Sequence, residues 1–237
     1  MPLRVAVTGA SRGLGAALAR EFGKRGHRLF LVARGVGELA ALAEEIQRSH
    51  GPESAAWRAH DLRDVDGIVA LARAAEEALG GVDVLVNNAA IGPYRPFLEN
   101  SAQDLHDLLA LNLEAPMRLA HAMLPGMLAR GGGQIVNIAS DLARRPLAQM
   151  APYVASKHGL LGFGASLHRE LRARGVRVTT VMPGVIDSSF NGSVEGSRDR
   201  RWALSTAALA QQVAALVELP AAMVIDELVV HPAEGDY

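Results

Sequence analysis

The run YVASK places a tyrosine and a lysine four residues apart, at Tyr153 and Lys157. Only two of the 24 basic residues are lysine, so an arginine would be expected here if any cation sufficed. An ammonium is a compact point charge and a guanidinium is a wide planar fork, so the two are not interchangeable in a close contact. Because residues i and i+4 share one face of a helix, the two side chains are predicted to project together. The alternative is a surface lysine without a role.

A phenol beside an ammonium suits the reduction of a carbonyl, which leaves negative charge on oxygen that must be stabilised and protonated. Tyr153 is the predicted proton donor. A free phenol has a pKa of about 10, so Lys157, together with an oxidised nicotinamide, is expected to lower the pKa of Tyr153. Ser140 follows an apolar strand, where its hydroxyl could donate a hydrogen bond to the substrate oxygen. Asp141 is expected to point to the opposite side and to serve a turn.

A glycine-rich turn, TGASRGLG, follows the first apolar segment and opens an amphipathic helix. Glycines lack the Cβ that would keep a pyrophosphate from the backbone amides, and the helix N-terminus adds unpaired N–H groups and positive dipole. The turn predicts a dinucleotide site formed by Gly9, Ser11, Arg12, Gly13, Leu14 and Gly15. The alternative is a tight turn without a ligand.

The residue that ends the second expected strand indicates which dinucleotide binds. Folds that prefer NAD usually place an acidic residue there, which accepts hydrogen bonds from the ribose hydroxyls. This chain has Arg34 instead, and Arg12 in the glycine turn adds a second guanidinium. Both favour a 2′-phosphate, so NADP(H) is predicted over NAD(H), and the hydride would come from that cofactor.

Short apolar segments alternate with longer helical patterns along the chain. The expected strands are 3–8, 28–33, 55–60, 82–88, 133–140, 176–183 and 226–232, and the expected helices are 13–25, 37–49, 65–79, 101–129, 152–174 and 205–218. This alternation predicts an α/β fold, a doubly wound, Rossmann-like parallel sheet of about seven strands with helices on both faces. The ligand crevice is then expected at the carboxyl ends of the strands.

Composition predicts one globular domain over 1–237. The chain is 49% hydrophobic and 21% charged, which is enough for a large core. A formal net charge of −1 gives no electrostatic footprint for nucleic acid or a lipid surface, and no apolar run reaches the length of a membrane span. With no cysteine, and with eight histidines that lack metal-ligand spacing, no metal and a cytoplasmic location are predicted.

The polar, Gly- and Ser-rich stretch 187–203 is predicted to be a substrate loop or lid. Together with 91–97 and 141–150 it follows expected strands at the cofactor edge, so these segments should line the substrate pocket. Six side chains would make it partly apolar: Tyr94, Phe97, Leu142, Met150, Phe190 and Trp202. Five arginines could form a basic rim for an anionic or carrier-bound substrate, or could simply be exposed: Arg144, Arg145, Arg198, Arg200 and Arg201.

These motifs resemble the short-chain dehydrogenase/reductase superfamily, in its single-domain branch, over essentially the whole chain. The family motif TGxxxGxG is matched by Thr8, Gly9, Gly13 and Gly15, and the family motif NNAG is matched by NNAA at 87–90, with Ala90 in place of the glycine. The family's Tyr-x-x-x-Lys pair falls on Tyr153 and Lys157, and Ser140 lies thirteen positions before the tyrosine. Within that family the chain resembles 3-oxoacyl and carbonyl reductases.

The resemblance implies roles for further residues. It makes Asn112 the partner of Ser140, Tyr153 and Lys157, holding a water that relays protons to the lysine. It places Tyr153, Lys157 and eight other residues against the cofactor, with a serine where the family commonly has a threonine at the nicotinamide carboxamide: Asp61, Leu62, Asn88, Ala89, Pro183, Gly184, Val185 and Ser188. It also implies a homodimer or homotetramer formed through 101–129 and 152–174, although burial within one subunit explains their composition equally well.

Three functions stay open at this point, all on a small-molecule substrate that the sequence does not identify. The first is NADPH-dependent reduction of a ketone or 3-oxoacyl group. The second is NAD-dependent oxidation of a sugar or secondary alcohol, against which Arg34 argues. The third is a non-catalytic, NADP(H)-binding regulatory protein, which the set of Asn, Ser, Tyr and Lys argues against because binding alone needs no phenol acid.

Overall fold

The seven apolar segments form one parallel sheet, as predicted. The computed structural model describes residues 2–197 and 202–234, and its strands lie in the order β3-β2-β1-β4-β5-β6-β9. Their bounds are Arg4–Thr8 (β1), Arg28–Ala33 (β2), Ala55–Ala59 (β3), Val84–Asn87 (β4), Gly133–Ile138 (β5), Val176–Pro183 (β6) and Glu227–Val230 (β9). The order reverses between β1 and β4, which opens a crevice at the carboxyl ends of the strands. The fold is therefore doubly wound and Rossmann-like, in a single domain.

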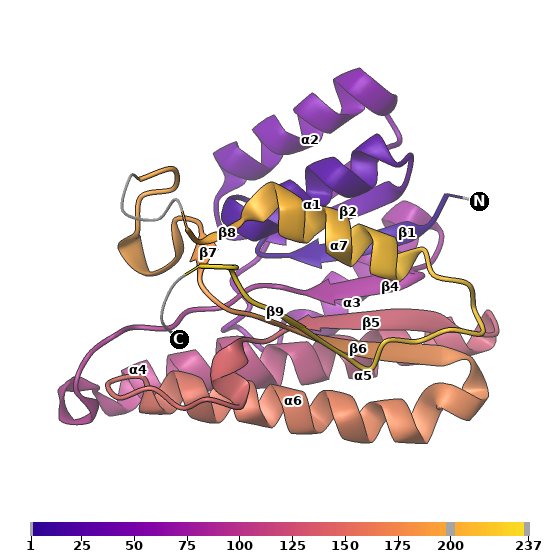
Figure 1. The fold of residues 1–237 in the computed structure, drawn as a ribbon. Coiled ribbons are helices and arrows are strands. Elements are labelled where there is room, and N and C mark those ends of the chain that lie inside the picture. The colour runs from indigo at the N-terminus through magenta and orange to yellow at the C-terminus, as the bar shows by residue number, and fades with distance from the viewer. Residues whose placement is uncertain (1, 198–201, 235–237) are drawn as a thin grey trace.

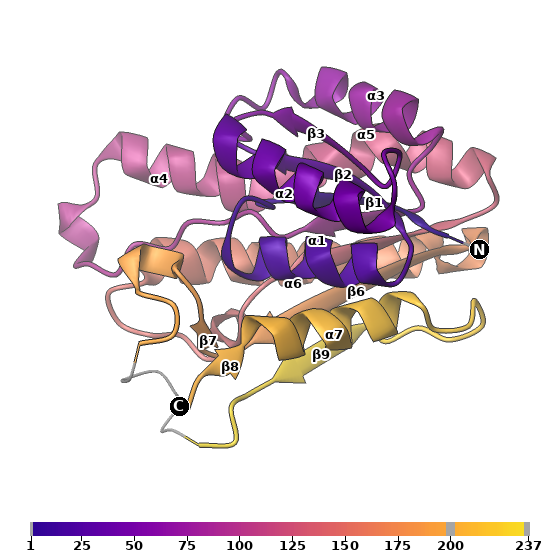
Figure 2. The same ribbon diagram turned by 90° about the horizontal axis from the view of Figure 1, so that it is seen from above.

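Helices cover both faces of the sheet (Figures 1 and 2). One face carries α1 (Gly13–Lys24), α2 (Val36–His50) and α7 (Thr206–Val217), and the other carries α3 (Ile68–Leu79), α5 (Ala115–Ala129) and α6 (Ala151–Leu171). Side chains alternate along each strand, so the sheet feeds two separate apolar cores: Val5 and Val7 enter the first, and Ala6 enters the second. Within the described ranges, no helix has the length and apolar character needed to cross a membrane.

A polar row crosses the sheet on its α6 side. Asn87 of β4 is aligned with Asn137 of β5, which is aligned with Thr180 of β6. All three are buried, and Asn87 Nδ2 donates a hydrogen bond to Asn137 Oδ1 at 2.9 Å. Gly164 of α6 packs directly on this row, since a Cβ there would lie 2.5 Å from Thr180 Oγ1. The row lies near the end of each strand, close to the crevice.

Two local features differ from the prediction. The single helix expected over 101–129 is α4 (Ala102–Leu109), a π-helical turn (Ala110–Glu114) and α5 in succession. The stretch 187–203 begins at β7 (Ile186–Asp187), which pairs with β8 (Leu204–Ser205), and it contains a short 3₁₀ turn at Phe190–Gly192. A two-residue strand is too short to show any periodicity, so the sequence pattern could not reveal β7 and β8.

Candidate active site

A cleft of about 1380 Å³ opens at the carboxyl ends of the strands. Of the residues predicted to bind the cofactor, all but Lys157 line it: Gly9, Ser11, Arg12, Gly13, Leu14, Gly15, Arg34, Asp61, Leu62, Asn88, Ala89, Tyr153, Pro183, Gly184, Val185 and Ser188. Pockets for drug-sized ligands usually enclose about 300–1000 Å³. The cleft therefore has room for a dinucleotide and a small substrate together.

The glycine turn is shaped for close approach of a phosphate. Gly9 has a φ of +66°, which favours glycine, and a Cβ on Gly15 would lie 2.1 Å from the Gly9 carbonyl oxygen. Arg12 occupies the N-cap of α1 without a side-chain capping hydrogen bond. No side-chain cap therefore covers the first amides of α1, and the helix dipole adds positive potential at the same point. These residues fit the pyrophosphate of a dinucleotide.

The adenosine end of the cleft holds two guanidiniums. Within the described part of the chain, Arg12 and Arg34 form no hydrogen bond or close ion pair. Asp61 instead bonds Arg63, with 2.5 Å between Oδ2 and Nη2, and this contact holds the pKa of Asp61 below its usual range. Glu38, which the sequence analysis did not single out, also lines the cleft at the start of α2. The arginines are thus available to an anionic ligand.

Tyr153 lies at the floor of the cleft with 7% of its surface exposed. Its ring packs against Phe190, with 6.0 Å between the ring centroids, and it shares a hydrogen bond with Ser140. Burial raises the pKa of Tyr153 to about 12; the negative charge of Asp141 acts in the same direction, and the Ser140 bond opposes both. This direction is opposite to the one predicted for the complete site. In the protein alone, burial and Asp141 therefore favour the protonated phenol.

Lys157 lies behind the cleft, fully buried on the same face of α6. Its Nζ donates a hydrogen bond to the Ile138 carbonyl oxygen at 2.9 Å and lies 5.5 Å from the centroid of the Tyr153 ring. Among the described residues no carboxylate is paired with it, and burial alone lowers the pKa of Lys157 to about 7. The tyrosine and lysine are adjacent, as their spacing predicted.

Asn112 joins the site from the π-helical turn, a type of irregularity often found at functional sites. Its side chain pairs with the backbone of Ile91: Nδ2 donates to the carbonyl oxygen at 2.7 Å, and Oδ1 accepts from the amide at 2.9 Å. The second Nδ2 hydrogen reaches Ser156 Oγ at 3.1 Å, and Ser156 Oγ donates to the Tyr153 carbonyl oxygen at 2.7 Å. The side chain thus ties the cleft wall to α6 and does not line the cleft.

The position of Asp141 corrects the sequence analysis. The strand ends at Ile138, so strand alternation no longer applies two and three residues later. Asp141 begins a 3₁₀ turn, as expected, but its Oδ1 accepts a hydrogen bond from Ser140 Oγ at 3.2 Å. Ser140 Oγ also accepts one from the Leu142 amide at 3.2 Å. The carboxylate therefore belongs to the cleft and not to the opposite side.

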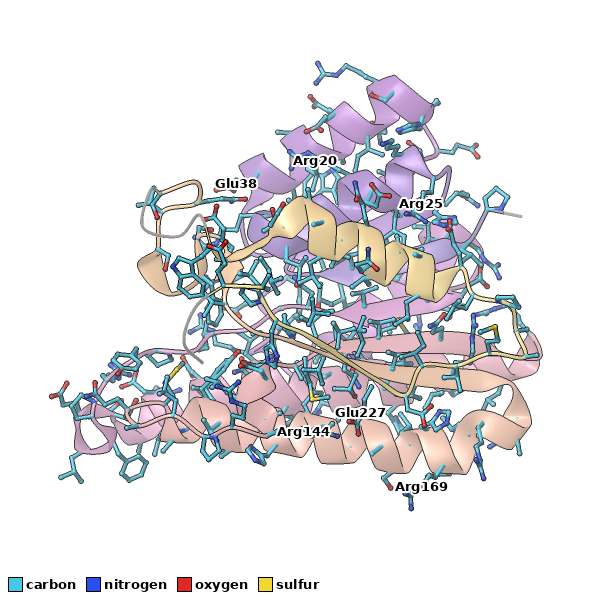
Figure 3. The ribbon with its side chains drawn as sticks, in the orientation of Figure 1. Arg20, Arg25, Glu38, Arg144, Arg169 and Glu227 are labelled. Atoms are coloured by element: carbon cyan, nitrogen blue, oxygen red, sulfur yellow. The ribbon has the colours of Figure 1, made fainter. Side chains whose placement is uncertain are left out.

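Most of the predicted substrate residues come together at the same cleft. Six of them line it: Tyr94, Ser140, Leu142, Met150, Tyr153 and Phe190. Phe97 and Trp202 are not among its described lining residues, whereas Pro146 and Leu147, which lie in the predicted segment 141–150, are. The arginine rim is only partly present. Arg145 lines the cleft, but Arg144 forms an ion pair with Glu227 (Figure 3), and residues 198, 200 and 201 lie outside the described residues.

Comparison with known proteins identifies the family. The family described as short chain dehydrogenase matches residues 4–199. The chain belongs to the short-chain dehydrogenase family. Among relatives of this short-chain dehydrogenase, the 3-oxoacyl-(acyl-carrier-protein) reductase FabG of Vibrio harveyi is 34% identical over 184 residues, covering 78% of this chain and 73% of that protein.

Solved structures similar to this short-chain dehydrogenase contain both kinds of nicotinamide cofactor. A variant of the actinorhodin polyketide ketoreductase with NADPH is 34% identical, covers 100% of this chain and 98% of its own, and has a TM-score of 0.89. A 3-ketoacyl-(acyl-carrier-protein) reductase from Brucella melitensis complexed with NADH is 26% identical, covers 97% and 96%, and has a TM-score of 0.87. Family membership therefore leaves the choice between NADPH and NADH to the residues of this chain.

Proposed function

We propose that this short-chain dehydrogenase reduces a ketone or 3-oxoacyl group with NADPH. The observation that carries the proposal is the convergence of Ser140 and Tyr153 at one cleft with a glycine turn that fits a dinucleotide, with Lys157 directly behind the Tyr153 ring. The similarity to a 3-oxoacyl reductase and a polyketide ketoreductase supports the same class of substrate.

Each of the three side chains has a distinct task in such a reaction. Ser140 donates a hydrogen bond that orients the substrate oxygen, and Tyr153 supplies the proton that neutralises this oxygen. Lys157 places positive charge behind the phenol and stabilises its anion after proton transfer. The bound cofactor supplies the hydride. Asn112 is a positioning residue in this scheme, because its side-chain amide is engaged by Ile91 and Ser156; the proton-relaying water implied by the family remains a prediction.

The test is consumption of NADPH and NADH by the wild type and by Tyr153→Phe against acyl thioesters, quinones, small ketones and keto sugars. Loss of the phenol proton should lower kcat by about 10²–10⁴-fold while the affinity for NADPH stays within a few-fold, as general acid catalysis requires. Retention of wild-type turnover by Tyr153→Phe would contradict the proposed role. Turnover only in the oxidative direction with NAD would favour a sugar or alcohol dehydrogenase instead.

Cofactor preference is proposed to rest on Arg34 and Arg12. A charge-assisted hydrogen bond to a 2′-phosphate contributes about 1.5–3 kcal/mol, so Arg34→Ala should weaken NADPH binding by roughly 10–100-fold and leave NADH binding nearly unchanged. Arg48→Ala is a matched control, because Arg48 is an exposed arginine on the neighbouring helix α2 and does not line the cleft. Equal losses for both cofactors in Arg34→Ala would contradict the assignment.

Homo-oligomerisation and the substrate loop are part of the same proposal. Leu109 and Met117, in the predicted interface segment 101–129, are both 43% exposed, which supports an apolar contact between subunits. Light scattering after size-exclusion chromatography should give a dimer or tetramer, and a monomer at micromolar concentration would contradict it. The stretch 187–203 is proposed to close over the substrate through Phe190 and Ser188, which line the cleft. A cytoplasmic location stays a prediction.

A further inference from the structure

The carboxylate of Asp141 lies between Ser140 and a histidine from the far edge of the sheet. Oδ1 accepts the Ser140 hydroxyl at 3.2 Å, and Oδ2 lies 3.6 Å from His231 Nε2. His231 follows β9, so its ring must cross the end of β6 to reach the turn after β5. Gly184 leaves space for this crossing, because a Cβ there would lie 3.1 Å from His231 Cδ2. Three chain segments thus build one contact beside the reacting groups.

We propose that Asp141 and His231 form an acid–base pair that positions the Ser140 hydroxyl and sets the balance between the reductive and oxidative directions. Neither residue is required to touch the substrate, so both are positioning residues. The inference rests on the proposed function, because it assigns a role relative to Ser140 and Tyr153. It adds a specific contribution from the C-terminal segment after β9, which the glycine, serine and tyrosine motifs do not include.

Asp141 influences which acceptor receives the single hydroxyl proton of Ser140. Asp141 Oδ1 lies 3.2 Å from Ser140 Oγ and competes with the Tyr153 oxygen for this proton, while the Leu142 amide donates to Oγ. A substrate oxygen must take this proton away from the carboxylate. Positive charge on the His231 ring, 3.6 Å from Oδ2, draws negative charge away from Oδ1, which makes the transfer of the Ser140 hydrogen bond easier. The pair therefore determines how strongly Ser140 is held in its resting orientation.

Asp141 also influences the protonation of Tyr153. The Asp141 side chain is only 12% exposed, so its negative charge is weakly screened from the phenol. That charge is one of the causes that raise the pKa of Tyr153, after burial. It disfavours the phenolate and so keeps the phenol as a proton donor, the form that reduction needs. Partial neutralisation by His231 moves the tyrosine toward the base form that oxidation needs.

Other charged or titratable groups on the elements packed here must be counted. Tyr153 feels the charge of Asp141, and the amides of Arg144 and Arg145 donate to the Asp141 backbone carbonyl. Lys157 on α6 and Glu227 on β9 belong to the neighbouring elements. Arg144 is occupied by Glu227, and Lys157 donates to Ile138. Lys157 also changes charge in the neutral range, because burial lowers its pKa to about 7. The contribution of the Asp141–His231 pair is therefore identified by the difference between variants, and not by the shape of a single pH profile.

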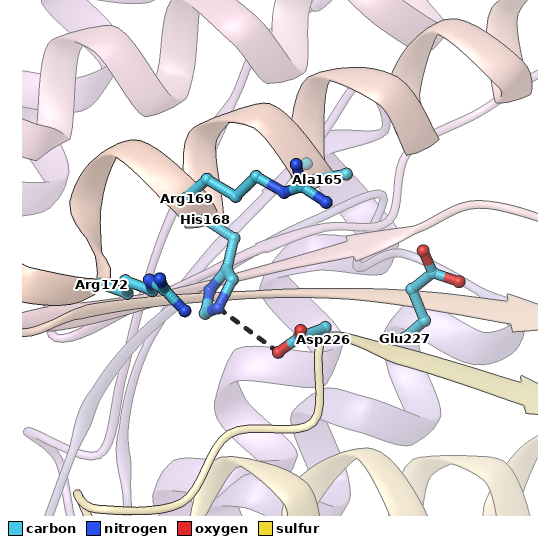
Figure 4. Close-up of a pocket in the computed structure, with 7 residues that line it drawn as sticks. Ala165, His168, Arg169, Arg172, Asp226 and Glu227 are labelled. Atoms are coloured by element: carbon cyan, nitrogen blue, oxygen red, sulfur yellow. Dashed lines mark ion pairs between the residues drawn. The ribbon is translucent and has the colours of Figure 1, made fainter.

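A second histidine–aspartate pair provides a matched control. His168 Nε2 lies 3.4 Å from Asp226 Oδ1 in a smaller cavity of about 470 Å³ between α6 and the start of β9 (Figure 4). Asp226 is at the opposite end of β9 from His231, and its side chain is 63% exposed. Within the described chain, Asp226 forms no hydrogen bond or ion pair with Ser140 or Tyr153, so removing its charge should not affect the titration of Tyr153.

The experiment measures kcat as a function of pH for reduction and for oxidation, with the carbonyl compound that the substrate panel above identifies and the corresponding alcohol. The proteins compared are the wild type, Asp141→Asn, His231→Gln, the double variant of these two residues, and Asp226→Asn. Removing the Asp141 charge lowers the pKa of Tyr153, so the acidic limb of the oxidative profile should move down by about one pH unit, the low end of the effect of one nearby charge. His231→Gln should move it up by less, because the carboxylate is left uncompensated. In the Asp141→Asn background, His231→Gln should have no further effect.

The outcomes are distinct from a failure of the proposed function. If Tyr153→Phe is inactive while Asp141→Asn leaves the limb in place, only this inference is wrong. Equal shifts of His231→Gln with and without the Asp141 carboxylate would also overturn it, as would a shift of the same size in Asp226→Asn. The same comparison can be made without turnover by following tyrosinate absorbance against pH in the NADP⁺ complex. Subtracting the curve of the same variant that also carries Tyr153→Phe leaves the titration of Tyr153. Coincident difference curves for the wild type and Asp141→Asn would contradict the proposal.

Discussion

The two halves of α6 bury polar side chains in opposite ways. In the N-terminal half, Lys157 is fully buried with a carbonyl oxygen as its hydrogen-bond partner and no carboxylate beside it in the described structure. In the C-terminal half, His168 is 7% exposed but faces Asp226, and two exposed arginines, Arg169 and Arg172, line the same small cavity. In the second half the buried side chain faces a carboxylate, whereas in the first half it does not.

A buried cation without a counter-ion is unfavourable unless something supplies the missing charge. The imbalance therefore indicates where a ligand completes the protein, and the balanced half indicates ordinary support of the fold. The position of the cleft agrees with this difference, because Tyr153 at its floor lies against Lys157. The following predictions test whether the two halves really differ in this way.

The largest effect is expected for the charge-conserving substitution Lys157→Arg. A planar guanidinium cannot replace a compact ammonium in a fully buried space next to a phenol, so kcat should fall by about 100-fold or more. Lys24→Arg is the matched control, since Lys24 is the other lysine of the chain and is exposed at the end of α1. Steady-state kinetics decides it: if Lys157→Arg keeps wild-type kcat, the first half of α6 needs only positive charge.

The second-largest effect is expected for Lys157→Met, which should raise the free energy of unfolding by an amount that depends on pH. Burial lowers the pKa of Lys157 to about 7, from an ordinary 10.5, so the unfolded chain binds more protons than the folded chain between these values. The cost of the ammonium is thus full below pH 7 and is relieved as the pH rises toward 10.5. Without cofactor, the variant should be more stable by roughly 2–4 kcal/mol near pH 6, and by much less near pH 10.

Urea unfolding at the two pH values measures this gain, with Lys24→Met as the control that should change little at either. A gain of equal size at both pH values would show that packing, and not charge, explains it. Saturating NADP⁺ should reverse the preference if Lys157 helps to hold the cofactor, because binding then stabilises the wild type more than the variant.

Between the two halves, Gly164 should tolerate no side chain. A Cβ there would lie 2.5 Å from Thr180 Oγ1 and 3.2 Å from Asn137 Nδ2, so Gly164→Ala should cost about 1–3 kcal/mol of unfolding free energy through overpacking. Gly162→Ala is the control on the same helix, since nothing lies within 4 Å of its added Cβ, and it should stabilise by roughly 0.5–1 kcal/mol. Thermal or urea unfolding of the two variants measures this difference. Changes of the same sign in the unfolding free energy of Gly164→Ala and Gly162→Ala would contradict the prediction.

The smallest effect is expected for Asp226→Asn in the second half. Its carboxylate is 63% exposed, so solvent screens the ion pair with His168, and the loss should stay below about 1 kcal/mol with unchanged kcat. Denaturant midpoints and steady-state assays check this directly. A large loss of activity would mean that the smaller cavity takes part in function, and the contrast between the halves would fail.

Much of the fold follows from patterns that are local in sequence. Apolar segments alternating with helical ones require βαβ units, and parallel strands bring their carboxyl ends to one edge, so Gly9, Ser140 and Pro183 had to meet there. The spacing of Tyr153 and Lys157 needed only helix geometry. These predictions depend on periodicity and motif order, which the sequence contains in full.

The features that the sequence did not reveal depend on contacts between distant segments. The π-helical turn at Ala110–Glu114 interrupts a continuous helical pattern and brings Asn112 against Ile91, and no local signal marks that contact. The contact of His231 with Asp141 requires two strand ends on either side of β6. The direction of the Tyr153 pKa depends on how deeply the phenol is buried, which spacing alone cannot give.

The polar row under α6 has a consequence for how the chain reaches this structure. Strand side chains alternate with a period of two, so a strand that paired one residue out of step would turn its whole inner set to the wrong face. For β5, such a slip would drive Asn137 into the apolar layer under α1 and α7, and loss of the hydrogen bond that its Oδ1 accepts from Asn87 would cost about 1–3 kcal/mol. Ser140 lies three residues farther along the same segment. The row therefore favours the observed register of β5, and in that register Ser140 lies at the cleft.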